Sequence, residues 1–336
     1  MLTATTIAGL AAWAAWAVGL ASGAWMGTRV YPAIEWLTLL GPLAVVPLGL
    51  PLLRARGLPD AEGDEPVDAE VRAWRRVEVA LPVGVLLALA SMVVEKGAIA
   101  GALGGGWAVV TWLVARRGWA RLRRRTPPGL AERCADAASL YLLGGGVMWA
   151  VARSGAWPFG LAEPVVTLAA THFHLAAFAL LAATAEVGRA LGATHGAARG
   201  PTRTAWVVAA WLAMIAPALV AIGITAWPPL ETGAAVLLSA AGLVLGLLMA
   251  TAVAPRVARL WPAALIAMGG LALAVGTAAA ALFALGRVVP PAAMVPLHGV
   301  ANGVFFGLGG LAGLRLARSR RGGKGTSPLR APSASR

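Results

Sequence analysis

Four ionisable side chains and one amide interrupt the long apolar stretches of this 336-residue sequence. They are Glu35, His172, His174, His298 and Asn302. An imidazole exchanges protons near neutral pH, a carboxylate can act as its partner, and an amide can orient either group through hydrogen bonds. Such groups are costly against lipid, so in membrane proteins they usually face the interior of a helix bundle and mark a functional site. These residue types therefore predict a substrate-binding or proton-relay site.

The composition places this site in a membrane protein. Apolar residues make up 59% of the chain, charged residues make up 12%, and the mean hydropathy is +0.76. So few charges cannot coat a soluble domain with a polar surface. They are also clustered, which leaves apolar runs of about twenty residues, the length that crosses roughly 30 Å of hydrocarbon. Because these runs are continuous, we expect an all-α fold, a polytopic transmembrane helical bundle, and not a β-barrel.

Ten membrane spans are predicted, at about 3–25, 32–53, 77–94, 98–115, 136–152, 164–185, 204–226, 231–253, 262–286 and 294–316. Only Glu95, Lys96 and Gly97 separate the third span from the fourth, so a tight helical hairpin and one interrupted element are both open. We expect a transmembrane domain over residues 1–317, with an acidic loop at 54–76 and a basic loop at 116–135. A basic, disordered tail at 318–336 follows.

The basic residues predict the orientation of the spans. If the spans alternate through the bilayer, 24 of the 28 Lys and Arg residues lie on one side, against Arg29, Lys96, Arg153 and Arg287 on the other. Cytoplasmic loops carry the excess of basic residues, so both termini are predicted to be cytoplasmic. Their expected partners are the bilayer and its anionic lipid headgroups, because no nucleic-acid-binding motif accompanies them.

The predicted topology puts all five polar residues in the outer half of the membrane, since the second, sixth and tenth spans begin on the non-cytoplasmic side. At 1.5 Å per residue, Glu35 and His298 lie roughly 5 Å inside the outer edge, and the other three lie about 12 to 15 Å inside it. In the sixth span, Thr167, Thr171 and His174 share one helix face. His172 points about 200° away from His174, so one helix cannot present both imidazoles to one metal ion.

In the tenth span, His298 and Asn302 share a face beside a column of glycines at 299, 303 and 307. Such a column lets another helix backbone approach closely. Three roles remain open for the polar residues: hydrogen-bonded structural groups, a proton or substrate site, and ligands of haem or a metal. An enzyme is not expected, because the sequence has no HExxH or GxSxG motif, no pair of intramembrane aspartates and no second intramembrane carboxylate close to Glu35. The single cysteine, Cys134, excludes an intrachain disulfide and a CxxC motif.

Three blocks around these residues resemble the bacterial YndJ-like membrane proteins. They are EWLTLLGPLAVVPLGL at 35–50, THFHLAAFAL at 171–180 and HGVANG at 298–303. The resemblance covers about nine-tenths of the chain and singles out six positions, which are Glu35, His172, Phe173, Phe178, His298 and Asn302. Ala177 stands where the family block has glycine, and His174 occupies a variable position.

The family is transporter-like and has no established substrate. The resemblance therefore implies a family and a candidate site but no mechanism. From the polar residues and the resemblance together, we expect a bacterial inner-membrane protein whose outer-half polar pocket binds a small solute or relays protons, and we expect no cofactor. The competing hypothesis is a membrane protein in which His172 and His298, from different helices, bind haem or copper.

Overall fold

The computed structural model describes residues 6, 7, 11 and 14, and then residues 30–54, 65–123, 129–161, 163–192, 200–286 and 288–318. The first predicted span, much of the acidic loop and nearly all of the tail lie outside these residues. Within them every regular element is helical, and nine helices are long and apolar enough to cross a membrane. The chain is thus a multi-pass, all-α membrane protein, and each of these nine helices overlaps one of the spans predicted from 32–53 onward.

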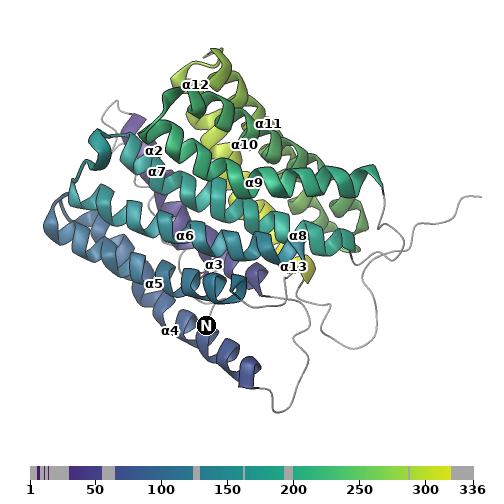
Figure 1. Ribbon diagram of the computed structural model, residues 1–336, viewed down its shortest axis with the longest axis horizontal. Helices are drawn as coiled ribbons and strands as arrows, with labels where there is room; N and C mark the ends of the chain where they lie inside the picture. Colours follow the sequence, from purple (N-terminus) through teal and green to yellow (C-terminus); the bar gives the residue numbers. More distant parts are fainter. Residues whose placement is uncertain are drawn as a thin grey trace, which may run out of the picture.

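Figure 1 shows how the helices are arranged. Four of the nine described spans change helix type along their length. The first consists of α2 Val30–Leu40, η1 Gly41–Val45, α3 Val46–Gly49 and η2 Leu50–Leu53. Another consists of α7 Val165–His172, η4 Phe173–Ala179 and α8 Leu180–Gly192, after the short η3 Pro158–Gly160. The remaining two are α10 Pro228–Leu248 with η5 Met249–Val253 and η6 Ala254–Arg256, and α12 Pro291–Met294 with η7 Val295–Gly310 and α13 Leu311–Arg318.

The other five spans are α4 Glu65–Val93, α5 Ala98–Leu122, α6 Leu130–Ser154, α9 Pro201–Thr225 and α11 Leu260–Gly286. Because α4 ends at Val93 and α5 begins at Ala98, the third and fourth predicted spans form a tight hairpin. Several spans extend further than predicted, and both predicted loops are correspondingly shorter. The reason is that charged residues at these helix ends form ion pairs within the bundle, as for Glu70 with Arg117.

The two ends of the bundle differ in charge. We call the end that holds η2 and the C-terminus of α13 the inner end, and the opposite end the outer end. Among the described residues, only Lys96 and Arg153 place basic side chains at the outer end, where the Gly97 N–H donates to the Arg153 carbonyl at 3.0 Å. The other described arginines lie toward the inner end, as the predicted charge segregation requires.

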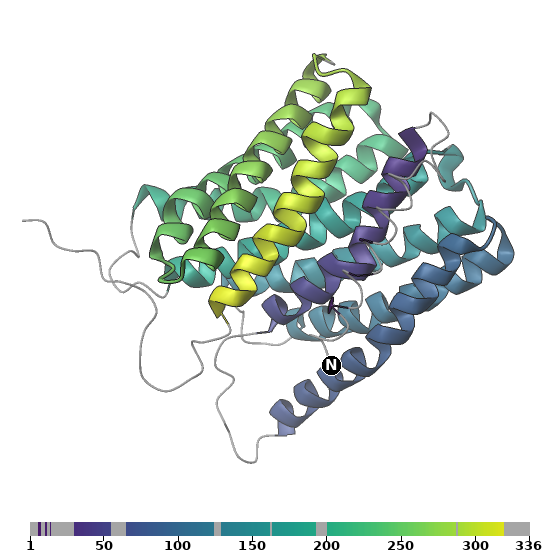
Figure 2. The ribbon, with the colours of Figure 1, turned by 180° about the vertical axis from the view of Figure 1, so that it is seen from behind.

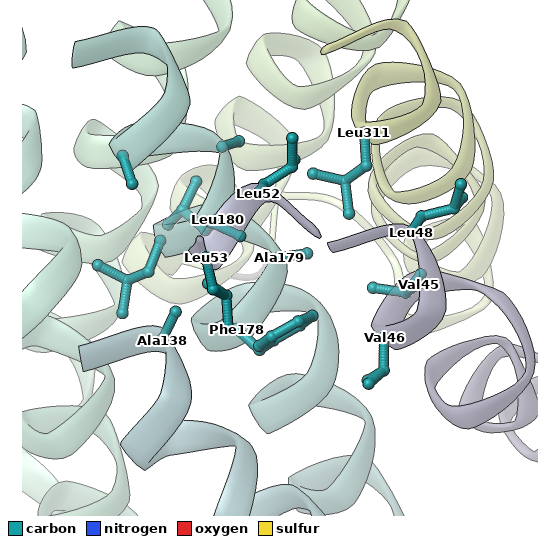
Figure 3. Close-up of a cluster of buried hydrophobic side chains, with 14 of the residues drawn as sticks. Val45, Val46, Leu48, Leu52, Leu53, Ala138, Phe178, Ala179, Leu180 and Leu311 are labelled. Carbon is teal, nitrogen blue, oxygen red and sulfur yellow. The ribbon is translucent and has the colours of Figure 1, made fainter. Parts of the chain in front are cut away.

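The segment from α2 to η2 is the core of the bundle. Residues 37–50 of this segment are all buried. Figure 2 shows the segment in purple beside η7 and α13 in yellow, and α2 and η7 are in contact. Leu48 and Leu52 gather with Phe178 and Leu311 in the close-up of Figure 3. The packing is tight, because a Cβ atom at Gly49 would lie only 2.7 Å from the Phe178 ring.

The inner end of this segment is buried, so its last carbonyl groups need partners inside the protein. Three arginines from three other helices supply them. Arg189 of α8 donates to the Leu52 carbonyl at 2.5 Å, Arg121 of α5 donates to the Leu53 carbonyl at 3.3 Å, and Arg318 donates to the Pro51 carbonyl at 2.9 Å. Positive charge is also favourable at this negative end of the helix dipole.

Carboxylates behind these arginines complete an ionic network. Arg189 forms a two-pronged pair with Glu132, at 2.7 and 2.9 Å, and lies 3.4 Å from buried Glu186. Arg121 pairs with Glu132 at 2.7 Å and with buried Asp136 at 3.0 Å. The network connects α5, α6 and α8 to the end of η2, and therefore fixes where the central segment sits.

We predict that Arg189→Met lowers the free energy of unfolding by about 1.5–3 kcal/mol, because it removes a charged donor from Glu132, buried Glu186 and the Leu52 carbonyl, which keep Arg121 or Arg318 as partners. Thermal unfolding in mild detergent measures the effect. Arg259→Met is the matched control, since Arg259 is exposed at the same end. Equal stability of the two variants would contradict a supporting role for the network.

Candidate functional site

The three helices that carry the five predicted site residues pack together in the outer half of the bundle. Glu35 lies on α2, His172 ends α7, His174 follows in η4, and His298 and Asn302 lie on η7. Helix α2 contacts both α7 and η7, and η4 contacts η7. The structure therefore brings the three sequence blocks side by side.

Each of these three spans contains a π-helical segment: η1, η4 or η7. A π-turn inserts an extra residue into the helical repeat, which turns the neighbouring side chains, and such turns are frequent at functional sites. Prolines near the starts of η1 and η7, Pro42 and Pro296, remove backbone donors there. The π-segments lie next to the polar residues in all three spans.

The predicted glycine column of η7 faces the central segment. A Cβ atom at Gly299 would lie 2.7 Å from Leu37, and one at Gly303 would lie 3.2 Å from both Leu37 and Leu40. At Gly307 it would lie 3.2 Å from Val45. The absence of side chains at these three positions lets η7 approach α2 and η1 closely, as predicted.

His174 is a fully bonded core residue. Its Nδ1 lies 2.7 Å from the Ala170 carbonyl, which can only accept, so Nδ1 carries the proton. Its Nε2 accepts a hydrogen bond from the Trp107 indole at 3.0 Å. The ring is completely buried, and Cβ atoms at Gly41 or Gly145 would each lie 2.8 Å from it. The bonding leaves His174 no free nitrogen, which favours a structural role.

His172 and His298 are bonded at one nitrogen only. Nδ1 of His172 lies 2.7 Å from the Leu168 carbonyl, and Nδ1 of His298 lies 2.9 Å from the Gly276 carbonyl. Both therefore carry the proton on Nδ1, and within the described part of the chain neither Nε2 has a hydrogen-bond donor. The two rings are neighbours, with centroids 6.0 Å apart and planes 25° apart. Two open acceptors thus lie together on different helices.

Asn302 lies beside this pair. Its Nδ2 is 3.1 Å from Nδ1 of His298, and its buried Oδ1 has no hydrogen-bond partner among the described residues. A Cβ atom at Gly276 would collide with Oδ1, so this glycine makes room for the amide. Because Nδ1 of His298 carries a proton and donates it to the Gly276 carbonyl, it cannot accept a hydrogen bond from Nδ2 of Asn302. The Asn302 amide can therefore bond to a further partner. The histidine pair and the amide form one polar cluster.

Glu35 faces a different place, a small cavity between α2, α4, α6 and α7. The cavity is lined by Glu35, Thr38, Met92, Trp149, Ala152, Arg153, Thr167 and Ala170. The volume that the centre of a water-sized sphere can occupy inside this cavity is about 10 Å³. This is room for about one water molecule. No histidine lines this cavity, so the predicted single pocket resolves into two neighbouring polar sites.

Arg153 faces Glu35 across this cavity. Its guanidinium donates to the Ser91 carbonyl at 2.8 Å and to the Val94 carbonyl at 2.7 Å, and it interacts electrostatically with Glu35 and Glu163. Sequence reasoning counted Arg153 only as an exception to the charge segregation. A basic residue that breaks the pattern on the outer side was the signal that could have identified it.

A row of polar side chains extends from the outer end past the cavity. Lys96 pairs with Glu163 at 3.1 Å, and the Thr167 hydroxyl donates to Glu163 at 2.9 Å. One turn deeper, the hydroxyls of Thr171 and Thr38 lie 2.6 Å apart and join α7 to α2. The face shared by Thr167 and Thr171 was predicted, whereas Thr38 was missed because a lone threonine in an apolar run carries little signal.

Comparison with known proteins identifies the family of the chain. A family model described as YndJ-like protein matches residues 36–306. No curated protein and no solved structure matches the chain. Because the family model covers well over half of the sequence, the chain belongs to the YndJ-like protein family.

Proposed function

We propose that this protein is a proton-coupled membrane protein that takes up protons through its outer half. The observation that carries the proposal is the contrast among its three described histidines. His174 has both ring nitrogens filled, whereas His172 and His298 each keep an open Nε2 acceptor. An imidazole whose Nδ1 proton is held by a carbonyl can accept a second proton at Nε2 and release it again.

The size of the cavity at Glu35 supports the proposal that protons, and not a larger solute, enter from the outer end. Room for about one water molecule is enough for proton transfer between a carboxylate and neighbouring hydroxyls, but it excludes an organic solute in this conformation. The row of polar side chains from Glu163 to Thr167 leads from the outer end to the cavity. Glu35 and the histidine pair would then be two protonatable groups at adjoining sites.

The charge distribution supports the direction of this uptake. The arginines of the inner end favour a cytoplasmic location for that end in a bacterial inner membrane, with both termini on the same side. The proton-accepting groups would then face the exterior of the cell membrane. Coupling to a small solute remains part of the proposal, with the solute entering when the outer helices separate.

We predict that Glu35→Gln lowers proton flux by about tenfold or more, because an amide cannot take up a proton at that position. The measurement uses the full chain in liposomes that contain a pH-sensitive dye, with a membrane potential set by potassium and valinomycin. Glu231→Gln is the matched control, since Glu231 is an exposed carboxylate in the first turn of α10 at the outer end. Equal flux from both variants and the parent protein would overturn the role of Glu35.

The three histidines should separate into two classes on substitution. His298→Ala should change the free energy of unfolding by only about 0.6 kcal/mol, as for a typical hydrogen bond between membrane helices. His172→Ala should cost no more, because His172 bonds within its own helix. Both variants should reduce flux. His174→Ala should cost about 2–5 kcal/mol, because it opens a cavity and leaves the buried Trp107 N–H unbonded. Thermal unfolding and flux are measured on the same preparations, with lipid-facing Leu243→Ala as control. If His172→Ala and His298→Ala unfold as readily as His174→Ala, the pair is structural.

A haem or copper site is the second candidate function. Metal-bound histidines usually donate their other ring N–H to a carbonyl or carboxylate, and His172 and His298 both do so. No cluster of three or more His, Cys, Asp or Glu side chains suited to a metal ion occurs among the described residues, so two imidazoles would hold the metal. We predict neither a Soret band nor stoichiometric copper in protein purified in mild detergent. Either result, lost in His172→Ala, would favour this candidate over the proton proposal.

A further inference from the structure

We propose that the inner ends of α4 and α5 form a binding site for the headgroup of an anionic phospholipid. Five exposed arginines mark the site: Arg72, Arg75 and Arg76 near the start of α4, and Arg116 and Arg123 at the end of α5. The two helices pack against each other as an antiparallel hairpin at one edge of the bundle (Figures 1 and 2). Their basic ends therefore lie together.

The described carboxylates beside this site pair with other arginines. Glu70 pairs with Arg117 and Glu78 pairs with Arg54, and the guanidinium carbons of Arg117 and Arg54 lie 3.6 and 4.6 Å from the centroid of Trp74. In contrast, none of the five exposed arginines has a carboxylate partner among the described residues. The five exposed arginines therefore give this described surface a net positive charge.

Aromatic side chains place this charge at the membrane interface. Trp112 and Trp119 are 47% and 54% exposed, and they lie one helical turn before Arg116 and Arg123. The guanidinium carbons lie 5.7 and 5.8 Å from the respective ring centroids. Exposed tryptophans are typical of the level where lipid headgroups meet the hydrocarbon.

The occupant must match both the charge and the apolar surface beside it. Val79, Val83 and Leu86 of α4 are 57%, 57% and 65% exposed, deeper in the membrane than the arginines. A phosphate group suits guanidinium donors, and acyl chains suit exposed aliphatic side chains. An anionic phospholipid carries both, whereas a free phosphate or a nucleic acid lacks the acyl chains.

Thermal unfolding of the full chain in detergent, titrated with phosphatidylglycerol, tests the site, because a ligand that binds the folded state raises the unfolding midpoint. We expect phosphatidylglycerol to raise the midpoint and phosphatidylcholine or inorganic phosphate to leave it unchanged. The Arg116→Gln/Arg123→Gln double variant should raise the half-saturating lipid concentration by roughly 25-fold, about fivefold for each arginine. Arg72→Gln/Arg75→Gln should act in the same way from α4.

Arg256→Gln/Arg259→Gln is the matched control, because both residues are exposed at the inner end but away from the hairpin. It should keep the phosphatidylglycerol response of the parent protein. If the control lost as much of the phosphatidylglycerol response as the hairpin variants, the effect would come from general surface charge, and the proposed site would be wrong. An unchanged phosphatidylglycerol response in both hairpin variants, or an equal response of the parent protein to phosphatidylcholine, would also contradict the proposed site.

Discussion

A helix that ends inside a protein needs hydrogen-bond donors for its last carbonyl groups. In this bundle, that requirement determines where the central segment lies. The central segment ends at η2, where Leu52 and Leu53 are buried and, among the described residues, no backbone N–H donates to their carbonyls. Arg121, Arg189 and Arg318 fill them instead, from helices far apart in the sequence. Their own charges are balanced by Glu132, Asp136 and Glu186. The inner end is thus a fixed point from which the central segment extends outward.

The outer half of the molecule depends on where that segment lies. With α2 held in place, Thr38 reaches Thr171 and Leu37 fills the space left by Gly299. These contacts hold α7 and η7 on two sides of α2 and leave His172 beside His298. In the proposed function, the ion-paired inner end holds the bundle together while protonation moves helices of the polar, π-helical outer half.

Much of this arrangement was predictable, because the bilayer imposes simple constraints on sequence. Span length and basic residues predicted the bundle and its charged end, and helical periodicity predicted that His172 and His174 face different surroundings. The bonding of each imidazole was not predictable, since the donor to His174 is Trp107, 67 residues away. The cavity at Glu35 was missed for the same reason, because it requires Arg153 from a distant span. Helix ends were predicted too short where charges such as Glu132 are paired inside the protein.

Nitrogen-15 spectroscopy of histidine-labelled protein in lipid bilayers tests the central contrast most directly, since it reports the bonding of each ring nitrogen. A His195→Gln background leaves the three described histidines, and single substitutions assign their signals. We predict a proton on Nδ1 in all three, with a hydrogen-bonded Nε2 in His174 alone. Acidification should then protonate the pair formed by His172 and His298 while His174 keeps its bond to Trp107. Three equivalent Nε2 signals, or protonation of His174 before the other two, would contradict the proposed difference between His174 and the histidine pair.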